Sequence, residues 1–505
     1  MKKRKNFLVF IVDQMQWKSL GCNGNKDVKT PNIDKLAGEG VTFQRAYCNN
    51  PVCTPSRSSI ITGLLPRQHG CVTNGRNLDM NIPTIGKVFN ENGYKTHSVG
   101  KLHYQPYIAD EVSYIVDGAY SYENKQLWDD GSIKKLPEGY YGFETSDYLG
   151  GHGRYCFGEY INWLNEKNKD VRELYKKENA YYNFKNVWKM PIDKELHYNS
   201  WIVERTNKYL DELNEDDNFF LWCSFPDPHT PFAACKPYSE MYDKNSLELP
   251  ESWDKKECYF DHLKARRDKV FLKKHGEMLS EEYIREVLAS TYGMITHIDD
   301  SIGEIVKKLE EKGMKEDTVI LFMADHGEYL GAHNLVYKGP WQFEETIRVP
   351  FIISSNKDKK RECKDVVSLV DIVPTLLEYA GIDEEVFDTR GLRNHTTPYL
   401  PGRSLMKYVE NNEEIEKRPA LVESDEDYFG GKLYRSRVMV DGKYKLTIYP
   451  NNGGGVLIDL EKDPCELNNL YYDKEYSEIK LEIIEKMLIE FIKYDRMDNP
   501  RIATP

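Results

Sequence analysis

The sequence predicts an α/β protein: a mostly parallel sheet flanked by helices, with a smaller C-terminal domain of antiparallel sheet and one helix. Three observations lead to this prediction. Apolar runs alternate with amphipathic stretches along most of the chain, and the pattern changes to closely spaced strands after about residue 400. In addition, a chain of 505 residues is too long to form a single small core. We therefore expect a large domain over residues 1–400 and an α+β subdomain over residues 401–505.

The expected strands of the large domain are short apolar runs bounded by polar turns, which is typical of strands buried on both faces. They cover Asn6–Val12, Tyr94–Val99, Asn218–Ser224 and Thr318–Met323. Apolar residues at helical spacing predict helices over Asn32–Gly40 and Glu281–Leu309, and Ser58–Thr62 is expected to start another. In such an arrangement, functional residues lie on loops at the C-terminal ends of the strands.

The smaller domain is predicted by strand-like stretches followed by an amphipathic segment. The expected strands are Leu421–Ser424, Ser436–Val440, Tyr444–Tyr449 and Leu457–Leu460, and the expected helix is Ser477–Tyr494. Residues 104–199 have weak periodicity, so we expect insertions that shape a pocket. Their aromatic residues could stack on sugar or aromatic rings, or pack as ordinary loops: Trp128, Tyr148, Tyr155, Trp163 and Trp188.

Composition excludes several classes of partner. A formal charge of −13 and a pI near 5.6 disfavour nucleic-acid binding, because no strong basic stripe can neutralise phosphates. The apolar run Phe7–Val12 is shorter than a signal-peptide core, and no stretch is long enough to span a membrane. Ten cysteines without a CxxC pair are typical of reduced thiols. We expect no nucleic-acid or membrane partner and a cytoplasmic location.

The segment Cys53-Thr54-Pro55-Ser56-Arg57, followed by Thr62-Gly63, is the most informative in the chain. CxPSR with a downstream TG pair resembles the pattern in which type I sulfatases have one Cys oxidised to formylglycine. The chain is similar here to arylsulfatase-like, formylglycine-dependent sulfatases of the alkaline phosphatase superfamily. The resemblance implies an alkaline phosphatase-like sheet, a maturation enzyme that modifies Cys53, and a hydrated aldehyde whose hydroxyl attacks the sulfur of a sulfate ester.

Two polar pairs follow predicted strands and predict a metal site. Asp13 and Gln14 come after the first strand, and Asp325 and His326 come after the strand Thr318–Met323. A single Asp after a strand is more often a turn or cap residue, but both pairs together with Cys53 indicate one divalent cation. The resemblance favours Ca²⁺, whereas Gln14 and His326 keep Mn²⁺, Mg²⁺ and Zn²⁺ open.

Further cationic residues match elements of the sulfatase pattern. Arg57 is expected to hydrogen-bond the diol. By resemblance, Lys101 in Gly-Lys-Leu-His binds a sulfate oxygen, His103 acts on the diol, His229 in His-Thr-Pro protonates the leaving oxygen, and Lys338 is a second sulfate-binding lysine. Such cations are needed because negative charge moves to the bridging oxygen as the S–O bond breaks.

These residues favour hydrolysis of a small-molecule or glycan sulfate ester. The alternative is a phosphonate monoester or phosphodiester hydrolase, a sister group with the same modified Cys. Gln14, His326 and Asn74, the last a candidate substrate-binding residue, resemble that group. Lys101 and His103 oppose it, because that group tends to have neutral Tyr and Thr at those positions. A noncatalytic protein of this fold is disfavoured, since none of the reactive residues is missing.

Overall fold

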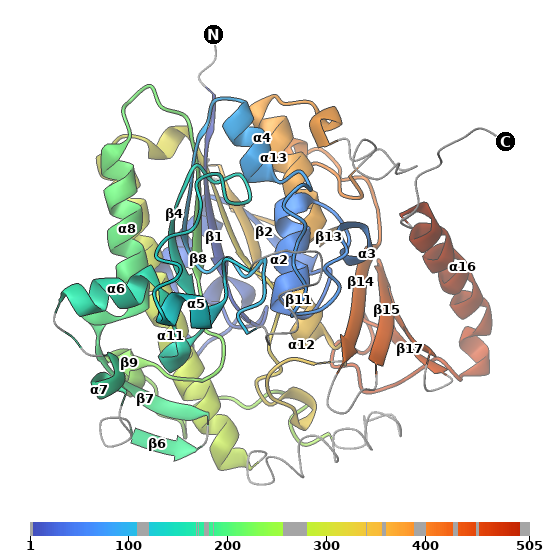
Figure 1. Cartoon of the computed structure of the whole chain (residues 1–505). Coiled ribbons are helices and arrows are strands. Elements are labelled where there is room, and N and C mark those ends of the chain that lie inside the picture. The colour runs from blue at the N-terminus through green and yellow to red at the C-terminus, as the bar shows by residue number, and fades with distance from the viewer. Residues whose placement is uncertain are drawn as a thin grey trace.

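A computed structural model describes residues 4–108, 121–167, 169, 171–175, 181–184, 186–255, 280–339, 341–355, 360–387, 400–427, 433–450 and 454–494. Its main body is a ten-stranded sheet between two layers of helices (Figure 1). A separate four-stranded sheet, covered by one helix near the C-terminus, lies beside this body (Figure 1). The predicted large sheet with its helices and the predicted smaller sheet with one helix are therefore both present.

The main sheet has the strand order β11-β2-β12-β10-β1-β8-β3-β4-β5, and β13 pairs with β2. Its strands are β1 (Asn6–Val12), β2 (Gly40–Tyr47), β3 (Lys95–Gly100), β4 (Thr145–Gly150), β5 (Phe157–Gly158), β8 (Phe219–Phe225), β10 (Thr318–Ala324), β11 (Arg348–Val349), β12 (Phe351–Ser354) and β13 (Arg361–Ser368). Strands β10, β1, β8, β3 and β4 are parallel neighbours, whereas β12, β11 and β5 run antiparallel to theirs. The sheet is mostly parallel, as predicted.

The three central strands end level with one another, and this alignment positions the candidate site. Every residue of β1, β8 and β10 is buried, which explains their continuous apolar sequences. Val12 at the end of β1 pairs with Phe225 of β8 and with Ala324 of β10. The residues that directly follow these strands therefore meet at one edge of the sheet.

Helices cover both faces of the main sheet (Figure 1). Helices α8 (Tyr198–Glu212) and α11 (Glu281–Glu311) lie over one face, and α2 (Cys53–Thr62), α4 (Ile85–Glu91) and α13 (Ile372–Ala380) lie over the other. Helix α1 (Pro31–Gly38) packs against α11. Helix α11 begins after Ser280, whose hydroxyl accepts a hydrogen bond from the Tyr283 N–H, and Glu281 and Glu282 in its first turn complement the helix dipole.

The start of helix α2 corrects one prediction. It begins at Cys53 rather than at Ser58, because Val52 is extended and Pro55 lies in the first turn, where its missing N–H costs nothing. The helix ends at Gly63, which adopts φ 69° and whose added Cβ would lie 2.9 Å from Cβ of Val373. All residues of the helix are buried. Cys53 therefore occupies the N-terminal turn of a fully enclosed helix.

Residues 104–199 are more than insertions, since β4 and β5 belong to the main sheet. Four of the five aromatic residues singled out there are buried, namely Trp128, Tyr148, Trp163 and Trp188, whereas Tyr155 is 52% exposed. Ordinary packing therefore accounts for these four. The shorter elements of the chain are α3 (Pro66–His69), α5 (Lys125–Asp129), α6 (Glu159–Glu166), α7 (Val171–Leu174), α12 (Glu344–Ile347), α15 (Met406–Asn411), and a small sheet of β6 (Tyr181–Phe184), β7 (Val187–Asp193) and β9 (Cys235–Lys236).

The C-terminal sheet is antiparallel in the order β14-β15-β16-β17, as predicted. Its elements are β14 (Ala420–Asp427), β15 (Leu433–Asp441), β16 (Tyr444–Tyr449), β17 (Gly454–Asp459) and helix α16 (Ser477–Lys493). A separate apolar core joins the sheet to the helix through Met439, Leu446, Leu457, Met487 and Phe491. The domain boundary at residue 400 stays a prediction.

A buried ionic cluster connects this sheet to the main body. The Lys445 ammonium donates to the Gln342 carbonyl at 2.8 Å and to the Glu466 carboxylate, and it lies 3.7 Å from Glu344 Oε1. Glu466 Oε2 also accepts from the Glu344 N–H at 2.6 Å. We call Lys445, Glu466 and Glu344 the interface cluster. It links the C-terminal sheet to the segment that follows Lys338.

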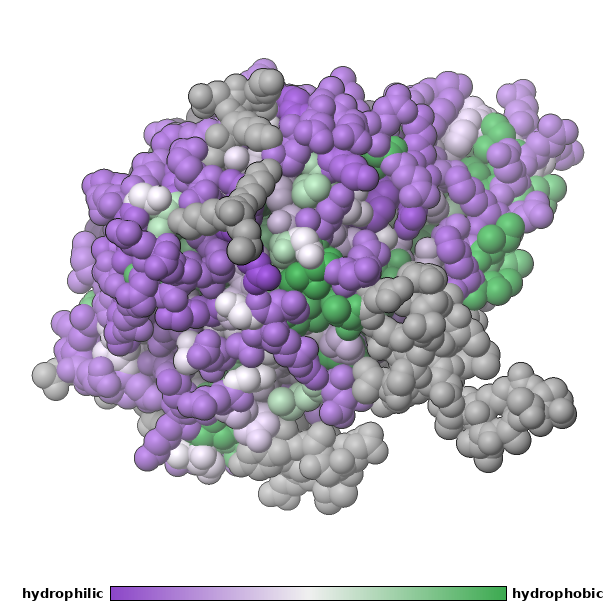
Figure 2. Space-filling model, turned by 90° about the horizontal axis from the view of Figure 1, so that it is seen from above, coloured by the Kyte–Doolittle hydropathy of each residue, from purple (hydrophilic) through white to green (hydrophobic). Residues whose placement is uncertain are grey.

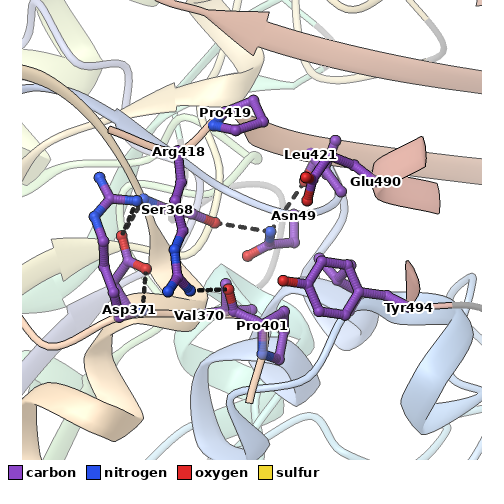
Figure 3. Close-up of a pocket in the computed structure, with 12 residues that line it drawn as sticks. Asn49, Ser368, Val370, Asp371, Pro401, Arg418, Pro419, Leu421, Glu490 and Tyr494 are labelled. Carbon is purple, nitrogen blue, oxygen red and sulfur yellow. Dashed lines mark hydrogen bonds and ion pairs between the residues drawn. The ribbon is translucent and has the colours of Figure 1, made fainter. Parts of the chain in front are cut away.

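A second interface feature is a small pocket lined by residues of the main body and by Arg418, Leu421 and Tyr494 (Figure 3). There the Asn49 amide donates to Ser368 Oγ and to the Leu421 carbonyl. With a volume of about 20 Å³ the pocket has room for a water molecule and not for a substrate.

The outer surface seen from above is mostly hydrophilic (Figure 2). Apolar side chains gather at its right edge and near its centre (Figure 2). In helix α16, Leu481, Leu488 and Ile492 are exposed. Among the described helices, none has both the length and the apolar composition needed to cross a lipid bilayer.

Candidate active site

Four side chains with metal-binding atoms meet where β1 and β10 end and α2 begins. Asp13, Cys53, Asp325 and His326 place one such atom each within 4.8 Å of the others, and all four are buried. Cys53 Sγ lies 3.5 Å from Asp13 Oδ1 and 3.3 Å from His326 Nε2. His326 Nε2 lies 3.7 Å from Oδ1 of both Asp13 and Asp325. Asp13 and the predicted pair Asp325 and His326 thus converge on Cys53.

Gln14 provides a test of whether this group fits a cation. Its backbone adopts φ 62°, which is unusual for a residue other than glycine, and its N–H donates to Asp325 Oδ1 at 3.0 Å. Its amide Nε2 donates to Glu328, whereas its Oε1 is buried and has no hydrogen-bond partner among the described residues. A buried carbonyl oxygen without a partner is costly, so the orphaned oxygen fits a cation ligand.

The orientation of His326 leads to the same conclusion. Its Nδ1 lies 3.0 Å from the Gly327 carbonyl, which can only accept, so Nδ1 carries the proton. The lone pair on Nε2 therefore faces Asp13 and Cys53. Burial lowers the pKa of His326 to about 4, which keeps the ring neutral. Two carboxylates, one amide oxygen and one imidazole nitrogen fit a divalent cation.

Arg57 contacts the Oδ2 atoms of both carboxylates, Asp13 and Asp325. Its Nε donates to Asp325 Oδ2 at 2.7 Å, and Nη2 lies 3.4 Å from Asp13 Oδ2. Nη1 donates to Ser224 Oγ at 2.8 Å and to the Lys101 carbonyl at 3.1 Å. These hydrogen bonds of Arg57 go to the two carboxylates, Ser224 and Lys101, and its expected bond to the diol stays a prediction. Because Arg57 occupies the Oδ2 atoms, both Oδ1 atoms remain turned toward the cluster.

Two buried lysines complete the cationic side of the site. The Lys101 ammonium bonds Asp13 Oδ2 and lies 2.6 Å from His152 Nε2. The Lys338 ammonium lies 2.9 Å from Cys53 Sγ, 2.9 Å from His229 Nε2 and 3.1 Å from His326 Nε2.

The charges in the site depend on one another. Burial alone would raise the pKa of Asp13, but the cations Lys101, Arg57 and Lys338 outweigh burial and hold it well below its usual range. Burial alone would lower the pKa of Lys338, but Cys53 and the two carboxylates raise it, so Lys338 stays charged. Burial also raises the pKa of the Cys53 thiol, and Asp13 adds to this effect. An unmodified Cys53 is therefore a poor thiolate nucleophile.

The two predicted catalytic histidines have different neighbours in the site. His229 Nδ1 lies 2.5 Å from the Thr230 carbonyl, so Nδ1 carries the proton and Nε2 accepts from Lys338. The ring of His103 stacks on Tyr107 with centroids 3.9 Å apart, and its Nδ1 has no partner among the described residues. Burial lowers the pKa of both histidines well below the usual value, and both rings are neutral.

Asn74 lies beside the nucleophile position without touching its sulfur. Its Oδ1 accepts a hydrogen bond of 2.9 Å from the Thr54 N–H in the first turn of α2. This contact satisfies one of the free N–H groups at the start of the helix. Asn74 therefore orients the turn that carries Cys53.

Sequence reasoning missed two residues of the site. Glu328 accepts hydrogen bonds from Gln14 and from the Tyr337 N–H, so it orients one candidate ligand and the segment that leads to Lys338. Its position two residues after His326 could have identified Glu328 as a site residue from the sequence. His152 stacks on His229, and it comes from the region where periodicity is weak, so only its place between two glycines pointed to it.

This arrangement suits the reaction of a tetrahedral oxyanion. Arg57, Lys101 and Lys338 bring three positive charges to a buried site whose carboxylates already face a candidate cation. Preorganised cations in a buried site stabilise the negative charge that develops as an ester bond breaks.

Comparisons with known proteins agree with this geometry. A family model described as Sulfatase matches residues 5–382, and one described as N-sulphoglucosamine sulphohydrolase, C-terminal, matches residues 331–493. The chain is 31% identical to the arylsulfatase of Clostridium perfringens, over 96% of this chain and 94% of that protein. It is 28% identical to the multifunctional alkaline phosphatase superfamily protein PehA of Trinickia caryophylli, over 96% of this chain and 95% of that protein.

Among solved structures, the phosphonate monoester hydrolase of Agrobacterium radiobacter superimposes with a TM-score of 0.78. The two chains are 24% identical, and the match covers 97% of this chain and 96% of the other. At this identity the likeness concerns the fold, and it confirms the predicted fold class.

Proposed function

The chain belongs to the sulfatase family of the alkaline phosphatase superfamily and is a sulfuric ester hydrolase, and we propose that it works through a formylglycine formed from Cys53. The observation that carries the proposal is the position of Cys53 at the buried start of α2, in contact with His326 and Lys338. Its raised thiol pKa disfavours catalysis by the unmodified cysteine.

One divalent cation completes the proposed site. Asp13, Gln14, Asp325 and His326 would hold it together with residue 53, and Ca²⁺ is the proposed ion, with Mn²⁺, Mg²⁺ and Zn²⁺ as alternatives. When bound, the cation would polarise an ester oxygen and lower the pKa of a nearby hydroxyl.

The residues around Cys53 have distinct proposed roles. The hydrated aldehyde supplies a hydroxyl that releases its proton to solvent and bonds to sulfur as the ester S–O bond breaks. Lys101 and Lys338 hold sulfate oxygens, and His229 gives a proton to the departing alcohol oxygen. His229 Nε2 takes up this proton from solvent, because the neighbouring Lys338 ammonium at 2.9 Å keeps its own proton. His103 takes the proton of the second hydroxyl as sulfate leaves and the aldehyde returns.

The alternative function is hydrolysis of phosphonate monoesters or phosphodiesters. Gln14 with its orphaned oxygen, His326 and Asn74 favour it. The buried ammonium of Lys101 and the imidazole of His103 oppose it, because Tyr and Thr are expected at these positions in that group. We therefore retain the sulfate ester as the proposed substrate.

The proposed partners are a small-molecule or glycan sulfate ester and a maturation enzyme that oxidises Cys53. An open pocket of about 390 Å³ begins at Tyr107, the residue stacked on His103, and could take the alcohol part of the ester. Because α2 is buried along its whole length, we propose that the maturation enzyme acts before the chain folds. The nine cysteines in the described part of the chain are free thiols, which supports the proposed cytoplasmic location.

The deciding experiment compares kcat/KM for 4-nitrophenyl sulfate with kcat/KM for a 4-nitrophenyl phosphonate monoester. The protein must first be shown by peptide mass to carry the aldehyde at residue 53. We expect a clear preference for the sulfate ester. A clear preference for the phosphonate would replace the proposed function with the alternative.

A further inference from the structure

We propose that His152 is a positioning residue of this site, which holds the leaving-group histidine and a sulfate-binding lysine in fixed relation to each other. The inference rests on the proposed function, since it assigns His229 and Lys101 those roles. The rings of His152 and His229 are nearly parallel, at 8°, with centroids 3.6 Å apart. His152 Nε2 lies 2.6 Å from the Lys101 ammonium.

Hydrogen-bond chemistry determines how the stacked pair is arranged. An ammonium has only donors, so His152 Nε2 accepts from Lys101 and the ring proton lies on Nδ1. The ring of His229 likewise carries its proton on Nδ1, and its Nε2 accepts from Lys338. Each neutral imidazole therefore holds one lysine, and the stack links the two lysines across the site.

The loop that carries His152 is shaped to reach this position. It follows β4, and Gly151 and Gly153 adopt φ 80° and φ 51°. An added Cβ at Gly151 would lie 2.2 Å from the Tyr155 carbonyl, and one at Gly153 would lie 2.8 Å from Pro231 Cγ. The two glycines thus allow the loop to pack directly against the turn His229-Thr230-Pro231.

A direct catalytic role or a metal-binding role fits His152 less well. No hydrogen bond joins His152 to Cys53 among the described residues, so it acts through its neighbours. Asp13, His152 and His229 could together hold a metal ion. However, the Lys101 ammonium already bonds both Asp13 and His152, and it provides the positive charge there.

Two substitutions separate the two contacts of His152. His152→Gln keeps an acceptor for Lys101 but removes the ring that aligns His229. His152→Phe keeps a flat ring against His229 but removes the acceptor. Each variant, with its aldehyde content measured, is tested with 4-nitrophenyl sulfate, a good leaving group, and with phenyl sulfate, which depends more on protonation. Tyr155→Phe is the matched control, since Tyr155 lies in the same loop and is 52% exposed.

We expect His152→Gln to lower kcat/KM about 100-fold for phenyl sulfate but less than about 5-fold for 4-nitrophenyl sulfate, because only the former needs an aligned acid. We expect His152→Phe to raise KM roughly 10-fold for both substrates and to leave the ratio of their kcat values unchanged. Tyr155→Phe should match the wild type in every constant.

The inference is overturned if His152→Gln lowers kcat/KM for the two substrates by the same factor. It is also overturned if both variants have the kinetic constants of the wild type. Failure of the proposed function would be seen separately, in a wild-type enzyme that prefers phosphonate monoesters. The same variants would then be compared with the 4-nitrophenyl and phenyl esters of that phosphonate, with the same expected pattern.

Discussion

The molecule contains two buried ionic clusters, and they use burial in different ways. In the interface cluster one cation, Lys445, faces two carboxylates of separate segments. In the catalytic cluster three cations face Asp13 and Asp325, and the orphaned oxygen of Gln14 adds an unsatisfied acceptor. The first cluster holds two parts of the fold together, whereas the second has the charges that the proposed cation and sulfate ester require. Substitutions should therefore change stability in one cluster and rate in the other.

The largest effect is expected at Cys53. Cys53→Ala and Cys53→Ser should each lower kcat/KM for a sulfate ester by about 10³-fold or more, because neither side chain can become the aldehyde. Unfolding in urea should change little for the Ser variant. Cys223→Ala is the control: this buried thiol lies in β8, away from the cluster, so the variant should keep its aldehyde and its rate. Substantial turnover by Cys53→Ala would contradict the mechanism.

Lys445→Met tests the other side of the comparison. Removing the cation leaves Glu466 and Glu344 buried without it, and breaking a buried pair costs about 3–5 kcal/mol of stability. We expect the free energy of unfolding, measured in urea, to fall by that amount while kcat at low temperature stays near the wild-type value. Glu466→Gln, which keeps the shape and removes one charge, should cost less. A variant with unchanged stability and lost activity would mean that this cluster belongs to the site.

Metal retention should depend on Gln14. Gln14→Leu removes the orphaned oxygen and leaves the carboxylates in place, so we expect affinity for the divalent cation to fall about 10- to 100-fold. The measurement is a chelator titration followed by metal analysis, with activity restored by added Ca²⁺ or Mn²⁺. Gln16→Leu, which loses only bonds to backbone carbonyls, is the control. Equal chelator sensitivity of Gln14→Leu and the wild type would remove Gln14 from the ligand set.

Asp13 and Asp227 give a second comparison, since both are buried but their pKa values move in opposite directions. Cations hold the pKa of Asp13 low, whereas burial raises the pKa of Asp227 to about 7 despite hydrogen bonds from Tyr198 and Asn199. A raised folded-state pKa means that the native state binds the proton more tightly than the unfolded state. The contribution of Asp227 to stability is therefore complete below the unfolded pKa of about 3.8 and is lost as the pH rises through about 7.

Asp227→Asn should remove this component. Between pH 5 and pH 6 the stability difference between wild type and variant should shift by about 1.4 kcal/mol in favour of the variant. Urea unfolding at several pH values measures it. Parallel stability curves for the two proteins would show that Asp227 has an ordinary pKa.

Much of the fold was predictable because the signals were local. The strand Asn6–Val12 was predicted with its observed bounds, since a continuous apolar run ends at Asp13. The start of α2 was not, because Cys53-Thr54-Pro55 has no helical periodicity and the helix is held by packing. The strand Thr145–Gly150 was also missed, since its alternation is weak and its place in the sheet depends on distant partners.

The site was predictable where residues follow strands. Asp13, Asp325 and His326 meet at Cys53 as expected, because the parallel strands end level. The partners of these residues were harder to find. Three contacts follow from side-chain geometry across long sequence separations. Arg57 binds two carboxylates, Glu328 accepts a hydrogen bond from the Gln14 amide, and His152 stacks on His229.

The most direct test of the central claim is the dependence of activity on the aldehyde. Preparations with different conversion of Cys53 can be made by expression with and without a formylglycine-generating enzyme, and conversion is measured by peptide mass. The account predicts that kcat per mole of chain for 4-nitrophenyl sulfate rises in proportion to the aldehyde fraction, on a line through the origin. Equal activity in a preparation that carries only unmodified cysteine would contradict it.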